Sequence, residues 1–253
     1  MSVIRNSKNR GFAAACNQGA QKSDADYLLF LNPDTVLIDD SLITPLHFMQ
    51  QPENSKIGIC GIQLVDALGN VNRTCSRFPT PGMFFFRMLG LVYLFPQIFH
   101  GQLMTDWDHR ENREVDQIMG AFFLVRRCLF EALGGFDERF FVYFEEVDFS
   151  LRARQADWSS FYLSDAQAYH KGGGTSEQVK AVRLFYSLRS RILYGFKHFG
   201  YFSAIGLMLG TLLLEPLARF FLGIAHCSFK EIIATFKGYK MLWNEIPALL
   251  KSV

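Results

Sequence analysis

Two groups of acidic residues have the type and spacing to do chemistry, and the first is at Asp34. It follows the apolar run 27–31, with only Asn32 and Pro33 between. A continuous apolar run predicts a buried strand of a parallel sheet, and a proline ends such a strand. Ligands of open α/β sheets bind beyond the carboxyl ends of strands, so Asp34 is placed to hold a divalent cation that bridges two phosphates. A turn acid or helix N-cap is the structural alternative.

The second group lies at Glu145, Glu146 and Asp148, among the aromatic residues of 136–149. On a helix that begins here, Glu145 and Asp148 share a face. Acids in a first helical turn are also favoured by the helix dipole, which is the purely structural explanation. An acid beside aromatic walls can instead hold and deprotonate a sugar hydroxyl, for which a base must come within ~3 Å of the proton. We favour the catalytic interpretation.

A third candidate is His170, which stands before Lys171 and the glycine run 172–174. A lone histidine is usually structural. At the end of a strand and beside a glycine loop, it can instead be a metal ligand or contact a phosphate.

The elements that must position these residues alternate between helical and strand patterns. We expect a helix capped by Asn9 and running to about Gln21, and Val3-Ile4 looks like the end of a strand. The segment 80–104 is apolar but irregular, because Pro81 and Pro96 interrupt it. The other expected helices are 42–50, 128–133 and 145–155, and the other expected strands are 57–65, 117–126 and 158–163, with 166–170 leading into the glycine run.

Composition restricts the class of protein. The 253 residues suffice for one α/β domain with an appendage, and a net charge of +2 gives no sign of nucleic-acid binding. Five cysteines without a CxxC pair argue against a disulfide framework and a zinc knuckle, and suit a cytosolic protein. Residues 1–170 carry 20 acidic and 15 basic residues, which suits a metal or sugar site, whereas residues 171–253 carry 4 and 11.

This basic C-terminal part is also apolar and helical in pattern. Residues 201–214 have no charge, which is short of the ~20 residues that span a bilayer. The longer run 199–225 is a weak candidate span, because it contains Glu215 and Arg219. We expect 176–253 to associate with an anionic membrane surface through interfacial helices, a solvated helical face being the alternative.

Taken in order, these blocks resemble the family 2 glycosyltransferases, in particular their bacterial rhamnosyltransferase-like branch. They cover about residues 3–176 in the order and spacing of the family. The resemblance rests on Asn9-Arg10-Gly11-Phe12-Ala13 with Asn17-Gln18-Gly19, Leu29–Asp34, Met119-Gly120-Ala121-Phe122 with Arg126 and Arg127, Gly134–Glu138, and Tyr143–Asp148 with Arg152 and His170.

The resemblance implies a GT-A (Rossmann-like) α/β fold in residues 1–175 and inverting transfer from a nucleotide-sugar donor. Asp34 and His170 would bind a divalent cation, Mg²⁺ or Mn²⁺. Glu146 matches the second acid of the family's Glu-Asp pair, the usual general base, with Glu145 beside it and Asp148 as the fallback. Substrate contacts are expected at Asn9, Gly11, Asn17, Asn32, Gly120, Ala121, Asp137 and Arg152.

The implied acceptor is a lipid-linked saccharide in cell-surface polysaccharide synthesis at the cytoplasmic face of the inner membrane, and rhamnose is the implied sugar. Members of the family begin with a further βαβ unit, so we expect this chain to be incomplete at its N-terminus. A catalytically inactive, truncated remnant that binds only a membrane or a partner is therefore an alternative. A metal-dependent nucleotidylyltransferase is disfavoured, because no glycine-rich, basic phosphate loop opens the chain.

Overall fold

Alternating burial along the strands shows why they form a sheet with helices on both faces. The computed structural model describes residues 3–171 and 180–252. In strand β1 (Tyr27–Leu31), Leu28 and Phe30 pack into one hydrophobic core, whereas Leu29 and Leu31 pack into a second core on the opposite face. Successive side chains of a strand point to opposite faces, so each face needs its own covering layer.

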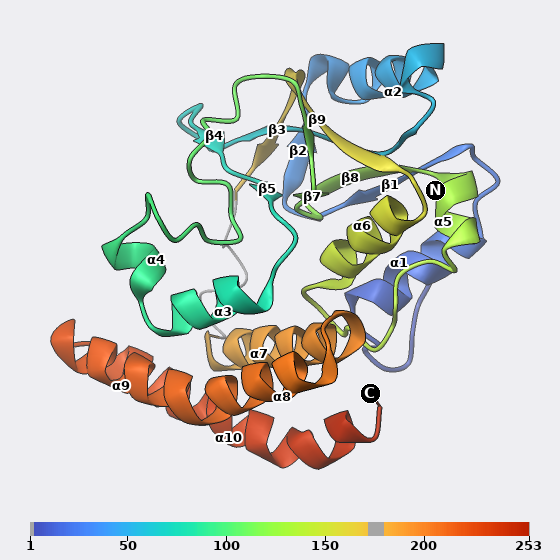
Figure 1. Ribbon diagram of the computed structural model, residues 1–253. Helices are drawn as coiled ribbons and strands as arrows, with labels where there is room; N and C mark the ends of the chain where they lie inside the picture. Colours follow the sequence, from blue (N-terminus) through green and yellow to red (C-terminus); the bar gives the residue numbers. More distant parts are fainter. Residues whose placement is uncertain (1–2, 172–179, 253) are drawn as a thin grey trace. The chain divides into compact units, whose positions relative to one another are not determined.

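The first core is covered by α1 (Phe12–Gln21), α5 (Arg127–Ala132) and α6 (Glu145–Gln155), and the second by α2 (Ile43–Gln50) (Figure 1). Five strands follow the order β1-β8-β3-β9-β2, with β4 beside β3 and β6 beside β9. The bounds are β2 (Thr35–Leu37), β3 (Ile57–Val65), β4 (Val71–Asn72), β6 (Arg113–Val115), β8 (Phe122–Arg126) and β9 (Ser159–His170). A separate pair consists of β5 (Cys75–Ser76) and β7 (Gln117–Ile118), and η1 (Asp39–Ser41) and η2 (Pro52–Asn54) are single 3₁₀ turns.

The expected parallel strand 27–31 is present, but its direction was predicted wrongly. Strand β1 pairs antiparallel with β8, which is also antiparallel to β3, and among the described strands only β3 and β9 pair in parallel. A continuous apolar run signals a strand with cover on both faces, and in a mixed sheet this holds whichever way the neighbouring strand runs.

Four other segments differ from expectation. The irregular segment 80–104 contains helices α3 (Pro81–Met88) and α4 (Leu91–Leu94). The Thr80 hydroxyl caps α3 by accepting a 3.3 Å hydrogen bond from the backbone N–H of Met83, and Pro81 is at the first helical position, where proline is favoured rather than disruptive. The expected strand 117–126 is divided into β7 and β8, and the two segments expected at 158–163 and 166–170 form the single strand β9. Val3 and Ile4 lie outside any strand.

The chain divides into two compact units. The first contains Met1–Phe78, Leu103–Phe141 and Glu145–Gly174, and carries the sheet. The second contains Pro79–Gln102, Val142–Phe144 and Thr175–Val253. Its bounds are wider than the expected 176–253, because Phe84 and Met88 of α3 pack with Leu207. Its long helices are α7 (Lys180–His198), α8 (Tyr201–Leu209), α9 (Glu215–Ala225) and α10 (Phe229–Leu250), with a π-helical turn, η4 (Gly210–Leu214), joining α8 to α9.

The acid within the apolar run of this helical unit is buried and paired. Glu215 is 7% exposed and bonds Arg191 of α7, while Arg219 bonds its other carboxylate oxygen at 2.8 Å.

Within the described part of the chain, Tyr201–Ala225 is the one helix long and apolar enough to cross a membrane. Length and composition alone do not choose between a span and an interfacial helix, so the interfacial placement stays a prediction.

Candidate active site

Strand register brings Asp34 and His170 together, although 135 residues separate them in the sequence. Strand β2 begins directly after Asp34 and pairs antiparallel with the end of β9, so that Thr35 lies opposite His170. Oδ1 of Asp34 is 3.4 Å from Nε2 of His170, and both side chains are partly buried. A carboxylate oxygen and an imidazole nitrogen at this separation suit a divalent cation. Among the described residues no group of three or more potential protein ligands gathers, so phosphate and water oxygens would have to complete the coordination.

The loop between β7 and β8 holds the Asp34 turn in place. The carbonyl of Ala121 accepts hydrogen bonds from the backbone N–H of Asn32 at 3.1 Å and from the hydroxyl of Thr35 at 3.3 Å. The backbone N–H of Thr35 in turn bonds the carbonyl of Asn32 at 3.1 Å. Thr35 was not among the residues expected from the sequence, although its position next to Asp34 was the available signal.

The same loop reaches the acidic pair. The backbone N–H of Gly120 lies close to the carboxylate of Glu146 and lowers its pKa. Gly120 and Ala121 are adjacent, so one dipeptide bonds the Asp34 turn through Ala121 and borders Glu146 through Gly120. This arrangement is the central feature of the candidate site, because it places the metal-binding candidates and the expected base beside a common piece of backbone.

Glu145 and Glu146 open helix α6, and neither carboxylate is fully paired. Each has one buried oxygen, Oε2, without a hydrogen-bond partner. Burial raises the pKa of Glu145 well above its ordinary value, and the adjacent charge of Glu146 raises it further. Burial also raises the pKa of Glu146, although backbone N–H groups at Glu146, Val147 and Gly120 partly offset this rise. A carboxylate with a raised pKa is a stronger base once ionised.

Asp148 is held differently. Its side chain is completely buried and accepts a 2.8 Å hydrogen bond from Nε of Arg152. The two remaining terminal nitrogens of Arg152 donate to the carbonyls of Leu133 and Gly135, both at 2.8 Å. The pair therefore holds α6 against the turn at Gly134-Gly135. This favours a positioning role for both residues over proton transfer by Asp148 or phosphate binding by Arg152.

Two more of the expected substrate contacts fix the backbone near this turn. The amide of Asn17 donates to the carbonyl of Phe136 at 2.9 Å and accepts from its N–H at 2.9 Å. Asp137 binds the guanidinium of Arg139 through both carboxylate oxygens. These side chains are engaged within the protein, and their substrate roles stay predictions.

Asn9 and Gly11 shape the start of α1. The Asn9 side chain accepts a 3.0 Å hydrogen bond from the N–H of Gly11 rather than capping the helix, which begins at Phe12 with Gly11 at the cap position. Gly11 has φ +94°, and a Cβ there would collide with the carbonyl of Phe141, which accepts a 2.7 Å bond from the N–H of Phe12. Glycine is needed for this close approach. The glycine run expected after His170 lies outside the described residues.

Comparison with known proteins adds a family and a fold. The family model described as "Glycosyl transferase family 2" matches residues 1–148. The chain is 34% identical over 93 residues to an N-acetylglucosaminyl-diphospho-decaprenol L-rhamnosyltransferase of Mycobacterium tuberculosis, covering 36% of this chain and 30% of that protein. It is 27% identical over 175 residues to the rhamnosyltransferase WbbL of Escherichia coli, covering 68% and 62%. The chain thus spans less than two thirds of the length of these relatives.

A solved structure of GalNAc-T7 with UDP, GalNAc and Mn²⁺ aligns with a TM-score of 0.52 at 13% identity, covering 98% of this chain and 45% of that one. This likeness shows the fold alone. The expected fold class is confirmed: a GT-A glycosyltransferase domain, followed by a helical C-terminal region.

Proposed function

The chain belongs to glycosyltransferase family 2, and from this membership we propose that it transfers a sugar, with inversion, from a nucleotide-sugar donor to a lipid-linked saccharide. The observation that carries the proposal is the position of Gly120-Ala121, which bonds the Asp34 turn and borders Glu146. A donor diphosphate and an acceptor hydroxyl must be bound at adjoining positions in such a reaction, and one candidate residue for each task lies beside this dipeptide.

In the proposed reaction, Glu146 removes the proton from the acceptor hydroxyl as the oxygen attacks the anomeric carbon. The bond from that carbon to the donor diphosphate breaks, and the diphosphate leaves with the bonding electron pair. Asp34 and His170 would hold a divalent cation, Mg²⁺ or Mn²⁺, which would supply positive charge beside the leaving diphosphate. Arg152 and Asp148 keep α6 in position. We assign proton transfer to Glu146 rather than Asp148, because Asp148 is paired with Arg152.

The names of the relatives support the finer assignment. Two are named as rhamnosyltransferases, and the name of the mycobacterial one specifies a diphospho-decaprenol acceptor. We therefore propose rhamnose as the sugar, a polyprenyl-diphosphate-linked glycan as the acceptor, and cell-surface polysaccharide as the product. The setting would be the cytoplasmic face of the plasma membrane.

The test is release of sugar from dTDP-, UDP- and GDP-linked donors, with and without Mn²⁺ or Mg²⁺, and transfer to a polyprenyl-diphosphate saccharide. Turnover of one donor that falls about 10²–10⁴-fold in Glu146→Gln would support the proposal. Glu53→Gln, a change at an exposed acid of η2, is the matched control and should keep full activity. Absence of turnover with every donor and both metals would contradict the proposal and favour the inactive remnant.

A further inference from the structure

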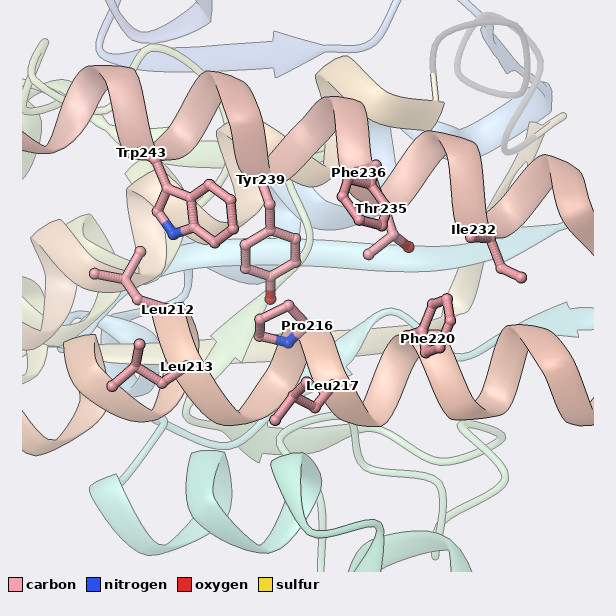
Figure 2. A pocket seen from close by; sticks show the side chains of 10 residues that line it. All are labelled: Leu212, Leu213, Pro216, Leu217, Phe220, Ile232, Thr235, Phe236, Tyr239 and Trp243. Carbon is pink, nitrogen blue, oxygen red and sulfur yellow. The ribbon is translucent and has the colours of Figure 1, made fainter.

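An apolar groove of about 380 Å³ runs between η4–α9 and α10 in the helical unit (Figure 2). Its volume is typical of small-molecule sites, which cover ~300–1,000 Å³. The Thr235 hydroxyl, the Tyr239 phenol and the Trp243 indole N–H are the polar side-chain groups among the lining residues, too few to orient a strongly polar ligand. The groove is lined by Leu212, Leu213, Pro216, Leu217 and Phe220 from one helix, and by Ile232, Thr235, Phe236, Tyr239 and Trp243 from the other.

The apolar surface continues outside the groove along α9. Phe221 is 65% exposed, Leu222 54% and Ile224 52%. The two charged side chains of Tyr201–Ala225 do not break this surface, because Glu215 is buried and Arg219 bonds it at 2.8 Å. Monomeric proteins rarely expose continuous apolar surface of this kind unless it binds a membrane, a ligand or another protein.

The positive charge of α10 favours a membrane over a ligand or another protein as the occupant. Phe229, Ile233 and Phe236 lie three or four residues apart on its exposed side, at 78%, 53% and 65% exposure. Three exposed lysines lie on the same side of this helix: Lys230, Lys237 and Lys240. Exposed aromatic residues interleaved with lysines are typical of a helix lying in the interface of an anionic membrane.

We propose that α9 and α10 dock flat on an anionic bilayer, with the groove between them occupied by a hydrocarbon chain of one of its lipids. The lysines would contact lipid phosphates, and Trp243 at 50% exposure would lie at the level of the headgroups. The proposal rests on the membrane setting of the proposed function, and adds to it the docking surface, the class of lipid and the depth of insertion.

The depth to which α10 enters the bilayer follows from the distribution of charge along the helix. Lys230 and Lys240 are ten residues apart, or about 15 Å along a helix. A helix that crossed the bilayer would take lysines spaced in this way into the hydrocarbon. Helix α9 shares the groove with α10, so both helices lie at the same depth and neither crosses.

The first test is co-flotation of the purified chain with phosphatidylcholine vesicles that contain or lack phosphatidylglycerol. We expect binding only to the anionic vesicles and its loss at high salt. The triple change of Lys230, Lys237 and Lys240 to Gln should weaken this binding about a hundredfold. The matched change of Lys8, Lys22 and Lys56 to Gln, at exposed positions in the first unit, should weaken it far less. Equal binding to both vesicles, or equal loss in both triple variants, would overturn the proposal.

The second test asks whether a lipid chain enters the groove. Phosphatidylglycerol with brominated acyl chains should quench the fluorescence of Trp243, and Trp243→Phe should lose this quenching while still binding. Phe236→Glu should weaken binding to these vesicles at least about tenfold. Leu68→Glu, at an 86% exposed leucine of the first unit, should bind them as the wild type does. Binding without quenching would contradict occupation of the groove by a lipid chain.

Other occupants give different results. If light scattering showed a stable dimer that Phe236→Glu converts to a monomer, the groove would belong to a second copy of the chain and the proposal would fail. Donor hydrolysis measured without vesicles separates this inference from the proposed function. Vesicle binding without hydrolysis would count against the transferase alone, and hydrolysis without vesicle binding would count against the docking surface alone.

Discussion

The two units hold buried carboxylates in opposite ways. In the helical unit, Glu215 bonds two arginines, one on each of its oxygens. In the sheet-containing unit, Glu145 and Glu146 lie side by side, each with a buried oxygen that has no partner. A paired carboxylate is fixed in its ionised form, whereas an underpaired one has its pKa raised and is suited to exchange a proton. The contrast distinguishes a structural acid from a functional one in the same chain.

The largest effect on stability should come from removing the paired acid. Glu215→Gln leaves Arg191 and Arg219 without their counter-charge, and breaking a buried pair in this way costs about 3–5 kcal/mol. Chemical unfolding measures this change in the free energy of unfolding. Glu231→Gln is the control, because Glu231 is half exposed and its ion pair with Lys180 is long, at 4.0 Å. This change should cost less than about 1 kcal/mol. Equal losses in the two variants would mean that Glu215 does not stabilise the helical unit through this pair.

A smaller effect is expected at the glycine that opens α1 in the sheet-containing unit. Gly11→Ala should cost about 1–3 kcal/mol, because φ is +94° and the added Cβ meets the backbone of Phe141. Gly19→Ala, within α1 and with open space around its Cα, should instead stabilise the protein by about 0.5–1 kcal/mol. Opposite signs in thermal unfolding would confirm the close approach. A neutral Gly11→Ala would show that the approach to Phe141 is not required.

The smallest effect should come from His109, a buried group that is satisfied in its neutral form. Its Nε2 accepts a 3.1 Å bond from the N–H of Cys75, so the proton is on Nδ1, facing the carbonyl of Trp107. Burial lowers the pKa of His109 below the ordinary 6.5. Below pH 6.5, His109 therefore binds a proton in the unfolded chain while it stays neutral in the folded protein. The stability that His109 contributes is fully present above 6.5, and is lost as the pH falls toward the folded pKa.

Urea unfolding at a series of pH values checks this prediction. The difference in unfolding free energy between the wild type and His109→Gln should shrink below pH 6.5. A difference that stays constant with pH would show that His109 is not held neutral in the fold.

Local patterns predicted much of the fold and less of the site. The strand Ile57–Val65 and the helix Glu145–Gln155 have the bounds expected from the sequence, because each has a clear pattern and a clear end. The helix at Pro81 was missed, because proline was interpreted as a breaker where it starts a helix after Thr80. Strand direction was also missed, since it depends on which segments pair.

The site shows the same limit. The sequence indicated Asp34, His170 and Glu146 separately, but it did not show that the loop at Gly120 and Ala121 lies beside both the Asp34 turn and Glu146. Nor did it show that the guanidinium of Arg152 donates its hydrogen bonds to groups within the protein. The carbonyls of Leu133 and Gly135 that accept these bonds become available only because the chain turns at Gly135. Contacts of backbone groups across the fold leave no pattern in the residue types.

The rate of donor turnover as a function of pH tests the central claim most directly, with Glu146→Gln beside the wild type. The base works in its ionised form, so the rate should rise with pH through the raised pKa of Glu146, with a midpoint above the ordinary glutamate value of 4.5. Glu146→Gln should lose both this limb and most of the rate. A wild-type midpoint at or below 4.5, or a Glu146→Gln variant with the wild-type rate and profile, would contradict the assignment of Glu146 as the base.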